Sequence, residues 1–311
     1  MNNNMYDVII LGGGPAGVAA GVYASRKRLS SLLLTKEIGG QSINSGSIEN
    51  FIGFEKLSGM EFSDVLEKHL RAQGHITIKT GVEVVNVSEG DNCVVLTDKQ
   101  GNEYRSRYLL LALGSQYKRL EAPGEREFEG KGVFYCSICD APLMKDKDVV
   151  VVGGGNSAFE AIIDLLPYAK TIHVFQRSGA IKADPVYQER IAKYEHVHIH
   201  LNREVKTFEG ETFLSSVTWK DSLSGEEGRL AVGGAFIAIG YIPNTPLVSK
   251  LVTLTEKQTV KVDRKTFQTS HPRIWAAGDI TDELYHQINT AMGDGVNAIL
   301  NIYDRVKMEE K

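Results

Sequence analysis

Two stretches of the chain share one pattern, and that pattern decides the fold class. Val8–Gly17 reads V-I-I-L-G-G-G-P-A-G, and Val149–Ala158 reads V-V-V-V-G-G-G-N-S-A. In each, a continuous aliphatic run precedes a glycine turn, and a helix-like pattern follows. Such runs are typical of buried parallel strands. The sequence therefore predicts an α/β fold that contains two strand–turn–helix units.

The spacing of the small residues indicates what the two turns bind. It is Gly12, Gly14, Gly17 in the first and Gly153, Gly155, Ala158 in the second. In this arrangement the first glycine permits the tight turn, the second lets the backbone approach a diphosphate, and the third small residue lets the helix pack on the strand. The helix N-terminus then offers free N–H groups to the anion. For one such motif a plain structural turn is a serious rival, but two in context favour two Rossmann-like dinucleotide-binding domains.

The order of further strands predicts that one domain is inserted into the other. Leu109–Gln116 and Phe236–Thr245 each end a strand with glycine, and Ile274–Asp282 is a strand that ends in Gly278-Asp279 before a helical pattern. We interpret the first two as crossover segments and the last as the completion of the first domain. The expected domains are residues 1–118 with 246–311, and residues 119–245.

Composition excludes several classes of protein. The 311 residues are 42% hydrophobic and 24% charged, with a formal net charge of −4 and no single-sign block. This balance argues against a nucleic-acid or polybasic membrane surface. No apolar run reaches the roughly 18–20 residues that span a bilayer, and the N-terminus M-N-N-N-M-Y-D lacks the features of a signal peptide. With three cysteines in all, a reducing cytoplasm is the expected compartment.

Two of the cysteines lie three positions apart, in G-V-F-Y-C-S-I-C-D-A-P from Gly132 to Pro142. A zinc ligand pair, a structural disulfide and a redox-active dithiol all use this spacing. Cys93 lies far away in a strand-like run and is interpreted as a buried thiol. The alternating set His196, His198 and His200 would share one face of a strand, where a polar strand face is favoured over a metal triad. We therefore expect no metal site.

In order and spacing, the motifs resemble the low-molecular-weight thioredoxin reductase family and the related C-terminal part of alkyl hydroperoxide reductase flavoproteins. The resemblance covers almost the whole chain. It rests on G-G-G-P-A-G, G-G-Q-S (Gly39–Ser42), I-E-N-F-I-G-F (Ile48–Phe54), C-S-I-C-D, G-G-G-N-S-A and A-A-G-D. The hydroperoxide reductase branch is echoed by K-A-D-P-V-Y-Q-E-R (Lys182–Arg190) and Y-I-P-N-T, and its N-terminal thioredoxin-like extension is not expected here.

The resemblance implies FAD on the first domain and a pyridine nucleotide on the inserted one. The expected FAD contacts are Gly12, Gly14, Pro15, Ala16, Gly17, Thr35, Gly40, Gln41, Asn50, Gly278, Asp279, His286, Gln287 and Ile288. The expected nucleotide contacts are Gly153, Gly155, Asn156, Ser157, Ala158, Arg177 and Lys182, and the crossover glycines Gly114 and Gly240 are also expected beside the cofactors.

Two of these positions depart from the usual patterns. His286 stands where the family carries an arginine before Gln287, and the place of the ribose-binding acid of general dinucleotide folds is taken by Thr35, with Glu37 just beyond. Within the resemblance, Gln41 and Asn50 contact the flavin half, Asp279 bonds the ribityl chain or diphosphate, and Gln287 approaches the flavin ring. The helix that starts there would stabilise negative charge on the reduced ring.

The resemblance also assigns the cysteine pair to redox chemistry. Hydride would pass from nicotinamide to FAD, and the Cys136–Cys139 disulfide would then be reduced, with Cys139 nearest the flavin and Cys136 attacking the partner's disulfide. Asp140 would shuttle the proton, and its other reading is a helix N-cap before A-P-L-M. The inserted domain would rotate about linkers near Tyr117–Gly124 and Tyr241–Pro246.

The electron donor is indicated by Q-R-S-G-A-I-K, Gln176–Lys182. NADH-binding sites place an acid at this strand end, whereas Arg177 and Lys182 are two cations without an acid. They favour NADPH over NADH; NADH and ferredoxin are the alternatives if both are ordinary solvated charges.

The sequence thus predicts an FAD-dependent thioredoxin reductase, with a homodimer implied by the resemblance alone. A glutaredoxin-like or peroxiredoxin partner is the second reading. The third is a flavin redox sensor without turnover, which Asp140 and two complete nucleotide loops argue against, because a sensor needs neither fast proton transfer nor a hydride donor.

Overall fold

The computed structural model describes residues 5–45 and 48–309, so the first four residues of the N-terminal stretch examined for a signal peptide lie outside it. The chain forms two compact units. Unit 1 comprises the chain up to Ser45, then Phe51–Gln116, and the chain from Ile242 onward. Unit 2 comprises Tyr117–Tyr241 and the short segment that ends at Asn50. Unit 2 is therefore inserted into unit 1 along the sequence.

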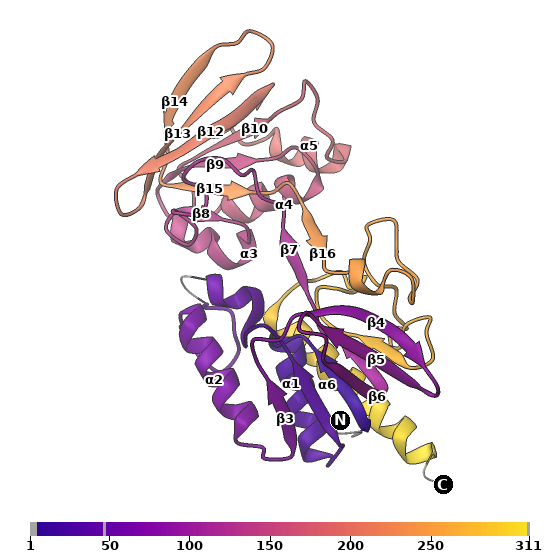
Figure 1. The fold of residues 1–311 in the computed structure, drawn as a ribbon. Helices are drawn as coiled ribbons and strands as arrows, with labels where there is room; N and C mark the ends of the chain where they lie inside the picture. The colour runs from indigo at the N-terminus through magenta and orange to yellow at the C-terminus, as the bar shows by residue number, and fades with distance from the viewer. Residues whose placement is uncertain (1–4, 46–47, 310–311) are drawn as a thin grey trace. The chain divides into compact units, whose positions relative to one another are not determined.

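Unit 1 is built on a seven-stranded sheet (Figure 1). Its order is β3 (Ile76–Lys79), β2 (Ser31–Leu34), β1 (Met5–Leu11), β6 (Glu103–Leu111), β5 (Cys93–Asp98) and β4 (Val84–Gly90). The first four strands are parallel, and β4 and β5 form an antiparallel hairpin on the far side of β6. β17 (Ile274–Ala276) pairs in parallel with Leu109–Leu111 of β6, so the C-terminal segment completes the sheet.

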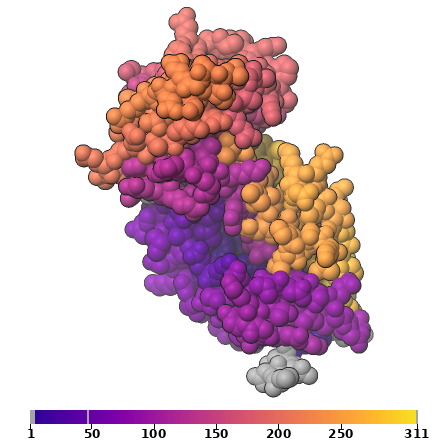
Figure 2. All heavy atoms as spheres, turned by 45° about the horizontal axis from the view of Figure 1, so that its top comes forward, coloured from indigo at the N-terminus to yellow at the C-terminus, as the bar shows by residue number. Residues whose placement is uncertain are grey.

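Three helices of unit 1 pack beside this sheet. α1 (Pro15–Arg26) follows β1, α2 (Gly59–Arg71) starts at a Ser58/Glu61 capping box, and α6 (Ile288–Glu309) ends the described chain. A Cβ on Gly21 would meet Leu70 at 2.7 Å, so α2 lies directly against α1. Two short 3₁₀ helices, η1 (Gly40–Asn44) and η3 (Pro246–Val248), lie in the loops. In Figure 2 the orange C-terminal segment of unit 1 packs against the purple strands that precede the insertion.

Apart from the short segment that ends at Asn50, the chain enters unit 2 after Gln116 and leaves it after Tyr241. These two steps fall in β7 (Ser115–Tyr117) and β16 (Tyr241–Pro243), which pair with each other as a two-stranded ribbon (Figure 1). Gly114 and Gly240, just before the two strands, have φ of +63° and +99°. Both linkers therefore begin at residues whose backbone favours glycine.

Unit 2 is built on a five-stranded parallel sheet. Its order is β11 (Val197–Leu201), β10 (Thr171–Gln176), β9 (Asp148–Val152), β15 (Gly234–Ile237) and β8 (Val133–Phe134). One side carries α4 (Asn156–Leu165) and α5 (Pro185–Ile191), together with the short α3 (Ser137–Asp140) and η2 (Ala141–Met144). The other side carries an antiparallel sheet of β12 (Arg203–Gly210), β13 (Leu214–Asp221) and β14 (Glu227–Ala231).

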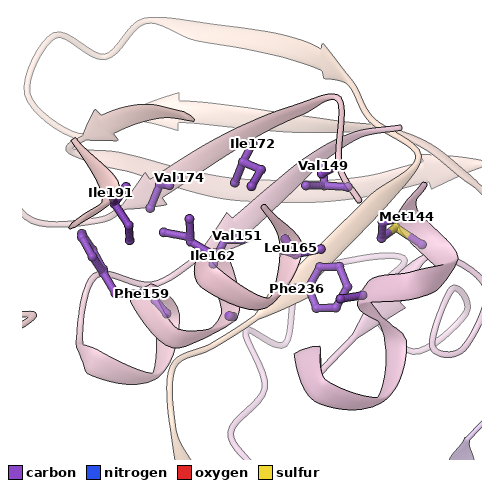
Figure 3. Close-up of a cluster of buried hydrophobic side chains, with 14 of the residues drawn as sticks. Met144, Val149, Val151, Phe159, Ile162, Leu165, Ile172, Val174, Ile191 and Phe236 are labelled. Atoms are coloured by element: carbon purple, nitrogen blue, oxygen red, sulfur yellow. The ribbon is translucent and has the colours of Figure 1, made fainter. Parts of the chain in front are cut away.

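The central strand β9 shows why V-V-V-V forms a buried strand here. Successive side chains of a strand point to opposite faces. Val149 and Val151 enter the core with Phe159 and Ile162 of α4 (Figure 3), whereas Val150 and Val152 enter the core beneath β12–β14. Because both faces are covered by apolar side chains, the strand needs no polar residue.

The predicted fold class is confirmed: both units are Rossmann-like α/β units, each with a strand, a glycine turn and a helix at its centre, and one is inserted into the other. Among the residues that the structure describes, no helix is long and apolar enough to cross a membrane.

Candidate active site

Cys136 and Cys139 form a disulfide at the start of a short helix in unit 2. Cys136 is the residue before α3 and Cys139 lies within it, with their Cα atoms 5.3 Å apart. The helix holds this spacing through a hydrogen bond from the Asp140 N–H to the Cys136 carbonyl, 3.1 Å. Both cysteines are half-buried, and Ile138 between them is exposed. The disulfide thus lies at a surface that another molecule can reach.

Asp140 directly follows the disulfide and is buried. Its burial raises the pKa of the carboxyl to about 7, because the charged form loses its hydration. Asp140 is also the residue before η2, but its side chain makes no capping hydrogen bond there. The side chain therefore does not serve as an N-cap, and its pKa suits proton transfer near neutral pH.

Two contacts fix the disulfide loop within unit 2. The Ser137 hydroxyl donates to Asp164 Oδ2 at 2.7 Å, which ties α3 to α4. The Asn50 amide nitrogen lies 3.9 Å from Cys139 Sγ. The sequence placed Asn50 at the flavin; the structure adds this contact with the sulfur.

In unit 1 the first glycine turn is tightly enclosed. Gly12 has a φ of +117°, and a Cβ there would lie 2.1 Å from the Ala112 carbonyl oxygen. A Cβ on Gly17 would lie 1.9 Å from the Gly12 oxygen, so only glycine lets α1 approach β1 this closely. Gly14 precedes α1 with free space around it except for Gly40, whose Cα lies 3.9 Å from the Cβ position. Pro15 is the first residue of the helix.

The loop after β2 closes over this turn. The Thr35 hydroxyl donates to the Glu37 carbonyl at 2.7 Å, and both groups face the position where Gly13 would carry a Cβ. Gly39 donates to the Gly13 carbonyl at 2.8 Å. The Gln41 amide donates to the Ser115 carbonyl at 2.7 Å, beside Gly114. The structure thus brings Thr35, Gly40 and Gln41 to the glycine turn.

The C-terminal segment approaches the turn from a third direction. A Cβ on Gly278 would lie 3.2 Å from Ala16 Cβ. Loss of hydration raises the pKa of Asp279, against the opposing charge of His286. Asp294 of α6 accepts from the Gly278 N–H at 3.3 Å, and burial raises its pKa to about 6. Asp294 was not predicted from the sequence, because G-D-G inside a helical pattern carries no local sign of this contact.

Gln287 and Ile288 mark the start of α6. Its first turn is closed by Thr290, whose hydroxyl accepts from the Gln287 N–H at 3.1 Å. The unit 1 candidates come from the loops that follow the strands at one sheet edge and from the first turns of the helices that follow these loops: Gly12, Gly14, Pro15, Ala16, Gly17, Thr35, Gly40, Gln41, Gly114, Gly278, Asp279, His286, Gln287 and Ile288.

In unit 2 the second glycine turn is open at Gly155. Gly153 has a φ of +140° and lies against the Ala238 carbonyl, whereas Gly155, which precedes α4, has no atom within 4 Å of its Cβ position. Ala158 already carries a methyl group, 3.2 Å from the Cβ position of Gly153. Asn156 in the first turn of α4, next to Ser157, donates to Asp184 Oδ2 at 2.9 Å and accepts from the Asp184 N–H at 2.8 Å.

A basic loop is tied to this second turn. The Lys182 N–H donates to the Gly154 carbonyl at 2.7 Å. Arg177 and Lys182 are exposed, and neither side chain makes an ion pair with any residue that the structure describes. The buried Gln176 shapes the loop by donating to Ser178 Oγ at 2.7 Å and to the Ala180 carbonyl at 3.0 Å. Two unpaired cations thus stand beside a glycine turn and a helix N-terminus.

The histidines form a separate group on the side of the unit 2 sheet that faces β12–β14. His173 of β10 pairs with His198 in register, and its Nδ1 lies 3.2 Å from His200 Nε2. Burial lowers the pKa of His200 to about 4, with Arg203 adding to the effect, and burial also lowers the pKa of His173. Within residues 5–45 and 48–309, no group of three or more His, Cys, Asp or Glu side chains could hold a metal ion.

The arrangement fits two dinucleotides on physical grounds. Each turn presents glycine where a side chain would block the backbone from a diphosphate, and each leads into a helix whose first N–H groups are available. The inserted unit adds a disulfide and a buried carboxyl. Two dinucleotide-type turns, a disulfide and a buried carboxyl thus occur in one chain.

The chain belongs to the pyridine nucleotide-disulphide oxidoreductase family, whose pattern matches residues 6–295. It is 37% identical over 305 residues to the F component of alkyl hydroperoxide reductase from Staphylococcus aureus, and the match covers 98% of this chain. The chain spans 60% of the length of that relative.

Solved structures of thioredoxin reductases share the fold. The enzyme from Streptococcus pyogenes matches with a TM-score of 0.92 at 31% identity, covering 99% of this chain and 100% of the other. The enzyme from Giardia duodenalis matches with a TM-score of 0.92 at 26% identity, covering 98% of this chain and 100% of the other. The resemblance seen in the sequence motifs is confirmed.

Proposed function

We propose that this chain is an NADPH-dependent, FAD-containing protein-disulfide reductase whose partner is thioredoxin or a thioredoxin-like protein. The observation that carries the proposal is the half-buried Cys136–Cys139 disulfide, followed at once by a buried carboxyl whose pKa is about 7. A structural disulfide needs no adjoining proton donor. A disulfide that opens in every turnover needs a proton donor, because its sulfurs are released as thiolates.

Asp140 supplies that proton. Reduction of the disulfide takes up two electrons and two protons to give the dithiol, and a carboxyl that is half-protonated near pH 7 can both give and take a proton there. The Cys136 thiolate then attacks the partner's disulfide, and Cys139 resolves the mixed disulfide, which re-forms the Cys136–Cys139 bond and releases the partner's dithiol. In sum, NADPH, H⁺ and a disulfide give NADP⁺ and a dithiol.

Unit 1 would hold the FAD. Gly12, Gly14 and the N-terminus of α1 would face the diphosphate, and Asp279 would bond its ribityl side. When bound, the flavin accepts a hydride equivalent from the nicotinamide and supplies two electrons for the disulfide. Burial raises the pKa of the Asp279 carboxyl, because the charged form loses its hydration.

Unit 2 would hold NADPH. Gly153, Gly155 and the first turn of α4 would face its diphosphate, and the exposed, unpaired Arg177 and Lys182 would contact the 2′-phosphate. The expected contact of these two cations with the 2′-phosphate, which NADH lacks, is the support for NADPH over NADH.

Anaerobic titration of the flavin-loaded protein tests the donor first. Loss of flavin absorbance at a far lower NADPH than NADH concentration supports the proposal. A preference for NADH overturns the role of Arg177 and Lys182. If neither nucleotide reduces the flavin, the nucleotide assignment fails and ferredoxin becomes the donor to test.

The partner is tested next, with thioredoxin and with a peroxiredoxin coupled through a dithiol adaptor. The 37% identity to the F component of alkyl hydroperoxide reductase favours the peroxiredoxin route as the second candidate. A higher kcat/KM with thioredoxin supports the main proposal, and the reverse ranking supports the second. The expected homodimer and the cytoplasmic location stay predictions, checked by light scattering and by cell fractionation.

A further inference from the structure

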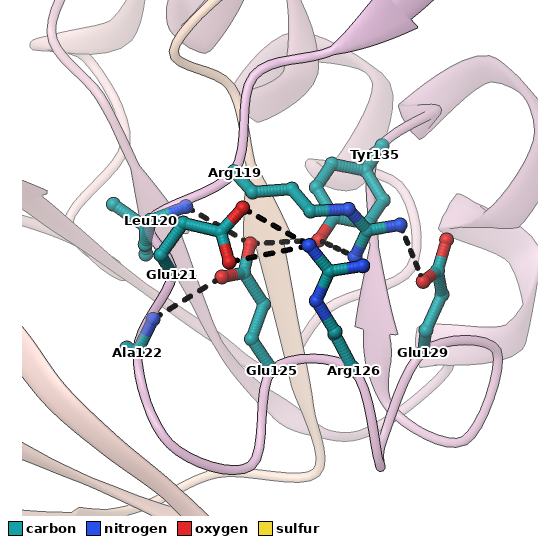
Figure 4. Close-up of polar contacts among 8 residues, drawn as sticks. All are labelled: Arg119, Leu120, Glu121, Ala122, Glu125, Arg126, Glu129 and Tyr135. Atoms are coloured by element: carbon teal, nitrogen blue, oxygen red, sulfur yellow. Dashed lines mark hydrogen bonds and ion pairs between the residues drawn. The ribbon is translucent and has the colours of Figure 1, made fainter.

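Tyr135, the residue before the disulfide, lies at the centre of a polar network in unit 2 (Figure 4). We call Arg119, Glu125, Glu129 and Tyr135 the Tyr135 network. Its first member comes from the segment that leaves the linker strand β7, and its last leads directly into Cys136. The network therefore joins two stretches of chain that are 16 residues apart.

The hydroxyl of Tyr135 both accepts and donates a hydrogen bond, and its ring stacks on another aromatic ring. Its hydroxyl accepts from Arg119 Nη1 at 3.0 Å and donates to Glu125 Oε1 at 2.7 Å. Its ring stacks on Tyr117 of β7, with centroids 5.3 Å apart and planes at 18°. Burial raises the pKa of the Tyr135 hydroxyl, and the neighbouring Glu125 raises it further, so the group stays a donor at physiological pH.

Glu125 is the buried anchor of the network, with 1% of its surface exposed. Besides the hydroxyl, it accepts from the Leu120 N–H at 3.0 Å and the Ala122 N–H at 3.3 Å. Arg119 in turn pairs with Glu129 at 2.6 Å, and both side chains are about one-fifth exposed. A buried carboxylate with three donors resists displacement, because removing one donor leaves it under-satisfied.

The two cysteines are anchored in different ways. Cys139 lies within α3, which the Ser137–Asp164 hydrogen bond ties to α4. Cys136 precedes the helix in extended conformation, and the chain that enters it comes from β8 through Tyr135. Apart from the hydrogen bond from the Asp140 N–H to the Cys136 carbonyl, the position of Cys136 in the dithiol form therefore depends on what holds Tyr135.

We propose that Tyr135 is a positioning residue for Cys136, and that the Tyr135 network sets the equilibrium between the disulfide and the dithiol. Closing a disulfide inside one chain is favoured in proportion to the effective concentration of one thiol at the other. The network raises that concentration by holding Cys136 close to Cys139 after the bond has opened. The proposal deepens the proposed function, since it concerns the same cysteines, but its test needs no turnover.

The test is a redox titration of the full chain with dithiothreitol. When dithiothreitol reduces the chain, the Cys136–Cys139 bond breaks and two electrons and two protons pass to its sulfurs. Dithiothreitol itself is oxidised to its cyclic disulfide. Alkylation of the free thiols and mass measurement give the reduced fraction. We expect Tyr135→Phe to be half-reduced at a roughly tenfold lower ratio of reduced to oxidised dithiothreitol than the wild type. Glu125→Gln should shift in the same direction, and the double variant should shift by less than the sum.

Tyr104→Phe is the matched control. Tyr104 also donates its hydroxyl to a buried carboxylate, Asp98 Oδ2 at 2.9 Å, but it lies in unit 1. This variant should lose comparable stability without a shift in the titration. Arg126→Ala, which removes an exposed ion pair with Glu121 next to the network, should also leave the titration unchanged. An unshifted Tyr135→Phe, or an equal shift in Tyr104→Phe, overturns the proposal.

The outcome is separable from that of the proposed function. The titration needs no added nucleotide or partner protein, and alkylation reports the thiols whether or not flavin is bound. If the wild type reduces no protein disulfide, the proposed function fails while the shift in Tyr135→Phe can still be measured. If the wild type is active and Tyr135→Phe does not shift, the positioning role alone fails.

Discussion

The two glycine turns have the same sequence pattern and different surroundings. In unit 1 the turn is enclosed by the loop after β2, by Ala112 and by the segment around Gly278. In unit 2 the turn is open at Gly155, and the nearby cations Arg177 and Lys182 are exposed. An enclosed turn suits a cofactor that stays bound through turnover, and an open turn suits a nucleotide that enters and leaves. Under the proposed function, the segments packed around each turn fit the same motif to these two tasks.

Substitutions at the third small residue of each motif should give the largest difference in stability between the two turns. Gly17→Ala places a methyl group 1.9 Å from the Gly12 carbonyl oxygen, so α1 must move off β1. We expect a loss on the order of 5 kcal/mol in the free energy of unfolding, together with loss of bound flavin. The equivalent Ala158→Gly in unit 2 should cost only about 1 kcal/mol. Urea unfolding followed by circular dichroism measures both, and similar losses would contradict the distinction.

Asp140 gives a pH-dependent test in unit 2. The folded chain holds the Asp140 proton up to about pH 7, whereas the ordinary pKa of an aspartate carboxyl is 3.8. The folded state therefore binds more protons between these values, and wild-type stability falls as pH rises through them. Asp140→Asn lacks this loss and should be more stable than the wild type above pH 7, by up to about 4 kcal/mol.

The stability gain from Asp140→Asn should disappear near pH 4. The same variant should reduce the partner's disulfide more slowly than the wild type at pH 7. Urea unfolding at pH 4, 6 and 8 measures the first effect, and thiol release from the partner measures the second. Parallel stability curves for the two proteins, or an unchanged rate, would show that Asp140 does not carry the proton.

The basic loop gives the next test. If Arg177 and Lys182 bind a 2′-phosphate, the double alanine variant should raise KM for NADPH by about ten- to a hundredfold, because charge-assisted hydrogen bonds are lost. KM for NADH should stay as it is. Arg190→Ala, at an exposed residue of the neighbouring α5, is the control. An equal rise for both nucleotides would show a general effect on the loop instead of phosphate recognition.

The smallest effect is expected at the second glycine of each motif. The Cβ position is open at Gly155 and lies 3.9 Å from Gly40 Cα at Gly14, so alanine should change the unfolding free energy of either by less than about 1 kcal/mol. The methyl groups would instead meet a diphosphate. Gly155→Ala should raise KM for NADPH several-fold, and Gly14→Ala should speed flavin loss on dialysis. Unchanged ligand binding in both would argue against diphosphates at these turns.

Much of the fold could be predicted because it depends on local patterns. Val149–Val152 is buried on both faces, so its continuous valines predict a central parallel strand, and the glycine turn after it marks the following helix. The antiparallel sheet β12–β14 was not predicted. Its strands alternate exposed and buried residues weakly, and their partners are set by packing against Phe175 and neighbouring residues of the central sheet.

Within the site, residue types could be predicted but their surroundings could not. The sequence placed Asp140 beside the cysteines, but its raised pKa comes from burial, which depends on tertiary packing. Asp294 reaches Gly278 only because α6 packs against β17 and α1. Likewise His196, His198 and His200 were expected on one strand face, but His196 lies before β11. The third histidine on that face is His173, which the parallel register brings across from β10.

The discontinuous path of the chain has a consequence for its biosynthesis. Unit 2 is complete once Tyr241 has emerged from the ribosome, whereas the sheet of unit 1 still lacks β17 and its α1 still lacks α6. Domains fold as units during synthesis. We infer that the disulfide-bearing unit folds first, while the nascent unit 1 waits for its last segment and exposes the apolar edge of β6. Limited proteolysis of ribosome-bound chains arrested shortly after Tyr241 would show a protected unit 2 and a cleavable unit 1, and a protected unit 1 at that length would refute this order.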